Sequence, residues 1–111
     1  MRKNVTLLGI AAALFTAPVG AETPEYSLII RDNRFHPEQL EVPAHTRVKL
    51  VVHNQDATPE EFESYELNRE KIIPGNSQAV LFVGPLKPGE YPFFGEFHEA
   101  TAQGVLIATQ D

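Results

Sequence analysis

Carboxylate side chains gather in one short segment in the middle of the chain, where they could bind a metal ion. Four glutamates stand there within seven residues, namely Glu60, Glu61, Glu63 and Glu66. Side chains alternate between the two faces of a strand, so Glu61 and Glu63 would share one face, and Glu60 would share the other with Phe62. Hard carboxylate oxygens suit ferrous and ferric iron, which predicts a site with oxygen ligands. Acids that alternate on an edge strand can equally be solvated charges that prevent aggregation, and both interpretations stay open.

A second group of polar residues lies near the C-terminus, where Glu96 and Glu99 flank His98. One imidazole joined by nearby carboxylates would add affinity for either iron or copper. The alternative is a surface histidine with an ion-pair partner. His36 follows Phe35, and if Phe35 is buried, His36 faces outward near the end of the first hairpin.

Sulfur ligands are missing from the domain. The sequence has no cysteine, and its one methionine is Met1. Tight Cu(I) binding is therefore disfavoured, because it needs thiolate or thioether ligands. There is also no Ser/His/Asp signature, glycine-rich phosphate loop or HExxH run, so nothing indicates a hydrolase, a transferase or a nucleotide-binding protein. If the protein is catalytic, the reaction would be the oxidation of Fe(II).

The first 21 residues are predicted to be a signal peptide, and residues 22–111 a single domain. Arg2 and Lys3 form a basic start, residues 5–15 an apolar stretch, and residues 19–21 a cleavage site of small residues. The apolar stretch is too short to span a bilayer, so we expect no membrane insertion after cleavage, although an uncleaved anchor is the alternative. This leader predicts a periplasmic protein.

Charge narrows the range of partners. Cleavage would remove Arg2 and Lys3 but no acidic residue, which changes the formal charge from −6 to −8. Such a surface disfavours nucleic acid and anionic lipid, and favours cations or basic protein surfaces.

The remaining sequence predicts an all-β, two-sheet Greek-key sandwich. Short apolar or alternating runs are separated by Pro, Gly, Asn and Asp, without a long helical period. The aromatic residues, including Tyr65 and Phe97, are predicted to pack in the core and loops. About seven strands are expected, over residues 26–31, 40–42, 46–54, 61–66, 77–83, 90–95 and 104–109.

Several motifs together resemble the cupredoxin family between about Tyr26 and Ala108. They include, in order, Phe35-His36-Pro37, Val48-x-Leu50-x-Val52-x-Asn54, Pro59-Glu60-Glu61-Phe62, Pro74-Gly75, Pro88-Gly89-Glu90-Tyr91 and the loop from His98 to Gly104. The resemblance implies a cupredoxin-like sandwich whose metal ligands lie at one end.

The ligand positions of the family are largely changed in this chain. The resemblance places Glu60 where a typical member has a histidine, Gly95 where it has a cysteine, and Ala102 where it has a methionine. The second family histidine is kept as His98. Because the thiolate is gone, blue-copper electron transfer is not expected. In the family His36 would lie on the metal side of the sandwich, which makes it a candidate extra ligand.

A narrower resemblance concerns Glu61-Phe62-Glu63 and the segment from Arg69 to Gly75. These are similar to the periplasmic cupredoxin domains of bacterial iron-uptake systems, the EfeO-type and FtrB-like proteins. The resemblance implies an accessory protein that binds iron, copper or both, and helps to oxidise Fe(II) and deliver iron to a permease, beside another periplasmic metal-binding protein. The predicted metal-binding residues are Glu60, His98, Glu61, Glu63, Glu96 and His36.

Two other functions remain open at this point. One is a copper-binding or copper-storage cupredoxin with a site that is not blue. The other is a metal-free interaction module that uses the old ligand end as a docking surface.

Overall fold

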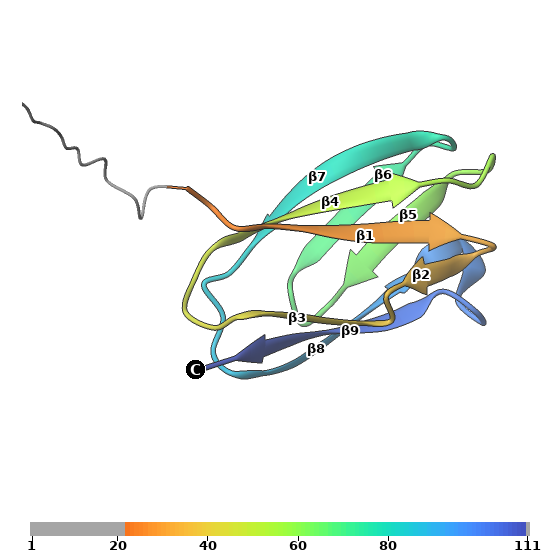
Figure 1. The fold of residues 1–111 in the computed structure, drawn as a ribbon. Coiled ribbons are helices and arrows are strands. Elements are labelled where there is room, and N and C mark those ends of the chain that lie inside the picture. Colours follow the sequence, from red (N-terminus) through yellow and green to blue (C-terminus); the bar gives the residue numbers. More distant parts are fainter. Residues whose placement is uncertain (1–21, 111) are drawn as a thin grey trace, which may run out of the picture.

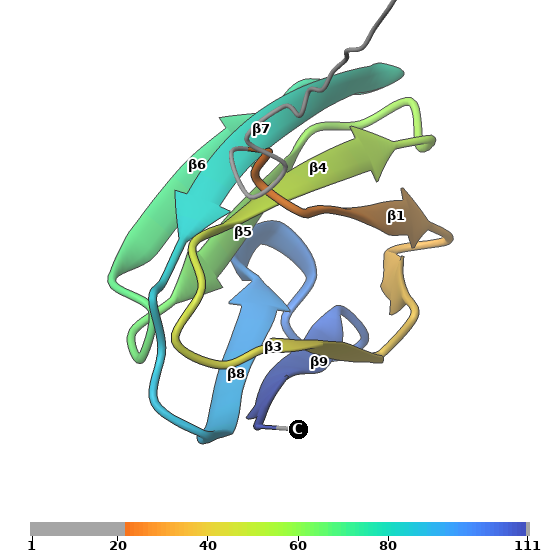
Figure 2. The ribbon, with the colours of Figure 1, turned by 60° about the vertical axis from the view of Figure 1, so that its left-hand side comes forward.

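The computed structural model describes residues 22–110, and the predicted signal peptide lies outside the described residues. Two β-sheets pack face to face (Figures 1 and 2). The four-stranded sheet has the order β2-β1-β4-β7, and the five-stranded sheet has the order β3-β9-β8-β5-β6. The strands are β1 (Glu25–Arg31), β2 (Arg34–His36), β3 (Gln39–Pro43), β4 (Val48–Asn54), β5 (Glu60–Ser64), β6 (Arg69–Ile73), β7 (Ser77–Val83), β8 (Gly89–Gly95) and β9 (Gln103–Thr109).

The predicted two-sheet β-sandwich is confirmed, but the predicted number of strands is wrong. The described residues form nine strands, because β2 and β6 were not predicted. β2 has three residues, and four of the five residues of β6 are exposed, so neither shows clear alternation of apolar and polar residues. The one helical segment that residues 22–110 form around the site is the short 3-10 turn η3 (Glu96–His98).

The space between the sheets is filled by apolar side chains at every second position of the strands. Val48, Leu50 and Val52 of β4 are fully buried, as their period of two predicts. Near one end of the core Phe35 packs edge-on to Phe93, with ring centroids 4.9 Å apart, and Phe62 stacks on Phe93 at 5.0 Å. Phe93 lies on β8, the strand that leads directly into η3.

The loop with η3 lies at the same end of the sandwich as the β1–β2 turn, away from the C-terminus (Figure 1). A hydrogen bond joins the two, since the Thr101 hydroxyl donates to the Asn33 carbonyl at 2.6 Å. Asn54 ends β4 at this end and is buried, with its amide nitrogen donating to the carbonyls of Thr58, Ile73 and Pro74. The side chains of interest are thus held between well-packed strands.

A helix long and apolar enough to cross a membrane is not found in residues 22–110.

Candidate functional site

Glu60 is a buried carboxylate that ties the start of β5 to the loop after β8. Its exposed fraction is 1%. Phe62 is paired with Gly95 in antiparallel β5 and β8, so Glu60, two residues earlier on the same face, lies beside Phe97. Its Oε1 accepts hydrogen bonds from the amides of Glu61 at 3.0 Å and Phe97 at 2.9 Å. Its Oε2 lies 2.7 Å from Nδ1 of His98. The structure therefore brings together Glu60 and His98, the two residues that the resemblance places at metal-ligand positions of the family.

Gly95 leaves the space that this carboxylate occupies. A Cβ atom at position 95 would lie 2.6 Å from Cδ of Glu60 and 2.7 Å from its Oε2. It would also lie 2.8 Å from Cβ of Ala102. All three distances are shorter than real Cβ contacts, so no larger residue fits here without displacing Glu60.

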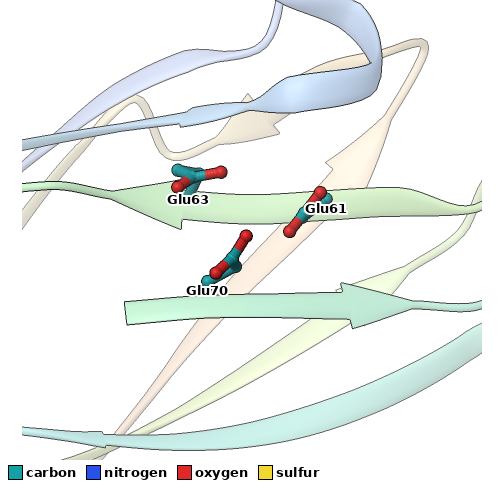
Figure 3. A group of neighbouring side chains, drawn as sticks. All are labelled: Glu61, Glu63 and Glu70. Atoms are coloured by element: carbon teal, nitrogen blue, oxygen red, sulfur yellow. The ribbon is translucent and has the colours of Figure 1, made fainter. Parts of the chain in front are cut away.

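A second cluster, called here the outer carboxylates, consists of Glu61, Glu63 and Glu70. Figure 3 shows Glu61 and Glu63 on β5 and Glu70 on the neighbouring β6. One oxygen of each lies within 4.8 Å of the others, and this is the one such group of three or more acid, His or Cys ligands in residues 22–110. Glu63 and Glu70 are directly opposite each other in the register of the two strands. Like charges in such positions destabilise a sheet unless a proton or a cation lies between them.

Electrostatics at the outer carboxylates favour bound protons. A hydrogen bond with Glu96, partial desolvation and the nearby charge of Glu70 together raise the pKa of Glu63 to about 7. Partial desolvation, followed by a hydrogen bond and charge repulsion from Glu70, also raises the pKa of Glu61. The cluster thus holds protons near neutral pH that a metal ion could displace.

The structure distributes the predicted residues over more than one place. Glu60 and His98 form the inner pair, and Glu61 and Glu63 lie on the outer face, as the alternation along β5 predicts. Glu96 is exposed and lies next to Glu63. His36 is partly buried, and its Nε2 lies 3.3 Å from the Arg31 carbonyl oxygen. Within residues 22–110 it is in no group of three ligands with the others.

Glu70 was missed by the sequence reasoning. It joins the cluster because β5 and β6 form a hairpin through a tight turn, in which Asn68 has a positive φ of 55°. The asparagine after the glutamate-rich segment was the signal available, since Asn is among the residues that tolerate this conformation in turns.

Two of the aromatic residues predicted to pack in the core and loops are exposed. Tyr65 is 73% exposed and Phe97 is 46% exposed. Ile72 of β6 is 54% exposed. The Tyr65 ring lies against Phe94 of the central strand β8, with ring centroids 5.6 Å apart. The outer carboxylates are therefore flanked by exposed apolar surface.

Comparison with known proteins settles the family. Residues 4–108 match the cupredoxin-like domain family over nearly the whole chain. The chain belongs to this family. A similar protein from Rickettsia prowazekii, itself uncharacterized, is 47% identical over 83 residues, which cover 75% of this cupredoxin-like chain and 66% of the relative.

Solved structures share the fold. Auracyanin A, a "blue" copper protein from Chloroflexus aurantiacus, aligns with a TM-score of 0.68 at 12% identity, covering 79% of this chain and all of that one. The metal-binding domain of a Cu(I)-exporting P-type ATPase from Streptococcus pneumoniae, solved with Cu(I), aligns with a TM-score of 0.65 at 14% identity, covering 78% and 85%. At such low identity these matches show the cupredoxin-like fold alone.

Proposed function

We propose that this cupredoxin-like protein is a periplasmic metal-binding accessory of ferrous-iron uptake, and that it binds iron through the outer carboxylates. The observation that carries the proposal is the convergence of Glu61, Glu63 and Glu70, with an oxygen of each within 4.8 Å of the others. A cation between them would relieve the repulsion of the opposed Glu63 and Glu70. The exposed carboxylate of Glu96 is near Glu63 but lies outside the group of three.

Ligand chemistry favours iron over copper at this cluster. The three side chains offer hard oxygen donors, and the domain has no sulfur donor. Copper is supported by the family, whose solved relatives include copper proteins, and by the imidazole of His98 close to the inner carboxylate. Substitutions can distinguish the two sites, because iron binding would require the outer carboxylates and copper binding would require His98.

Calorimetric titration of the purified protein with Fe(II), Fe(III) and Cu(II) tests the proposal. We expect one iron ion per chain, and a loss of affinity of roughly tenfold or more in Glu63→Gln and in Glu70→Gln. Glu41→Gln is the matched control, because Glu41 is an exposed glutamate on another strand of the same sheet. Unchanged iron affinity in both cluster variants refutes the site. Copper binding that is lost in His98→Ala but kept in Glu63→Gln favours the copper function instead.

Delivery of iron to a permease would need a docking surface beside the metal. The exposed side chains of Tyr65 and Ile72 next to the acidic cluster support such a contact with a basic, partly apolar partner. The same surface supports the second candidate, a metal-free interaction module. That candidate requires no metal uptake at micromolar concentrations and a partner whose binding is lost in the Tyr65→Ser variant.

A further inference from the structure

The inner pair, Glu60 and His98, is hydrogen-bonded whether or not the outer carboxylates bind a metal ion. Both oxygens of Glu60 already accept hydrogen bonds, Oε1 from two backbone amides and Oε2 from His98. The carboxylate is 1% exposed, and the side chain of His98 is 29% exposed. A metal ion entering the interior here would have to displace three hydrogen bonds.

With Glu60 ionised, the contact determines which nitrogen of His98 carries the proton. An ionised carboxylate can only accept, so Nδ1 of His98 must donate to Glu60. In the neutral imidazole the other nitrogen, Nε2, then keeps its lone pair. Since Nδ1 faces a buried group, Nε2 is the ring nitrogen left for a ligand from outside.

We propose that Glu60 is a positioning residue that closes the interior of the loop end to metal ions and holds His98 as the Nδ1–H tautomer. Nε2 is then the ring atom open to a ligand. Gly95 is needed for this arrangement, because a side chain at position 95 would collide with the Glu60 carboxylate. The Gly95 amide donates to the Ala102 carbonyl at 2.9 Å and closes the loop, which keeps Gly95 beside Glu60.

The isosteric variant Glu60→Gln separates positioning from simple packing. Its carbonyl oxygen can still accept from the amides of Glu61 and Phe97, which places the NH2 group against Nδ1 of His98. Two donors cannot face each other, so His98 must change to the Nε2–H tautomer and accept at Nδ1. A residue that only filled space would leave the tautomer unchanged.

Long-range 1H–15N NMR of the imidazole at about pH 8.5, where an ordinary histidine is neutral, reads the tautomer directly. We expect a protonated Nδ1 and a bare Nε2 in the wild type and in the control Glu61→Gln, and the reverse in Glu60→Gln. A protonated Nε2 in the wild type overturns the proposal, as does an unchanged tautomer in Glu60→Gln. These outcomes are independent of whether the outer carboxylates bind iron.

A stability measurement tests the role of Gly95. We expect Gly95→Ala to lower the urea midpoint of the wild type more than it lowers that of Glu60→Ala, because the collision with Glu60 is absent from the second background. The close approach to Ala102 is present in both backgrounds and cancels in the comparison. Equal effects in the two backgrounds refute the link between Glu60 and Gly95.

Discussion

Truncation of the buried carboxylate in Glu60→Ala should destabilise the domain strongly. The change removes the acceptor of three hydrogen bonds, two from backbone amides and one from His98 at 2.7 Å. Removing one partner of a buried, hydrogen-bonded pair costs about 3–5 kcal/mol, because the remaining groups are left without partners. His98 is partly exposed and can recover a bond to water, so the lower end applies, about 3 kcal/mol.

That loss is a large part of the stability expected for a domain of this size. At about 0.05–0.15 kcal/mol per residue, a chain of this length has roughly 5–15 kcal/mol in total. A loss of about 3 kcal/mol would lower the melting temperature by roughly 12–24 °C. Urea unfolding followed by circular dichroism measures the loss, with Glu41→Ala as an exposed control.

A loss below about 1 kcal/mol would refute this reasoning. It would mean that the cost of desolvating the carboxylate cancels the three hydrogen bonds it accepts. The slope of the unfolding curve should stay unchanged, since a changed slope would indicate an altered denatured state instead of a lost contact.

Three further predictions concern other parts of the domain. The pKa of Glu63 is raised to about 7 from its usual 4.5, so the folded state holds more protons than the unfolded state between these values. The urea midpoint of the metal-free protein should therefore fall as the pH rises from 5 to 8, and Glu63→Gln should flatten that dependence. An equally steep dependence in the variant would contradict the prediction. Asn54→Ala should cost about 1–3 kcal/mol in urea unfolding, because three carbonyls, that of Ile73 buried, lose their shared donor. A neutral effect would show that these carbonyls find other donors. Phe93→Ala should lower the free energy of unfolding in urea by about 3–5 kcal/mol, because it opens a cavity between Phe35 and Phe62. Phe93→Leu should lower it less, and equal losses would argue against a tightly packed cluster.

The sequence predicts best what depends on local periodicity. The alternation along residues 60–63 separates the buried Glu60 from the half-buried Glu61 and Glu63, because neighbouring side chains of a strand must point to opposite faces. The same rule predicts the buried face of β4. The fold class follows from the repetition of such segments between turn residues.

Contacts between strands were harder to predict. Glu70 completes the outer carboxylates through the β5–β6 register, and most of β6 is exposed on an edge of its sheet, where polar and apolar residues need not alternate. The exposure of Tyr65 and Phe97 was missed for a similar reason. Aromatic residues are usually buried, and only the arrangement of the neighbouring strands shows that these two are not.

The pairing of β3 with β9 determines when the five-stranded sheet can be completed. β9 lies between β3 and β8, and it joins β3 in parallel, although the two strands come from opposite ends of the domain. A growing chain that still lacks residues 103–109 therefore cannot complete the five-stranded sheet, and the inner side of β3 has no hydrogen-bonded neighbour. The five-stranded sheet is therefore completed only once residues 103–109 are available, and a chain cut before residue 103 would leave β3 without a strand partner.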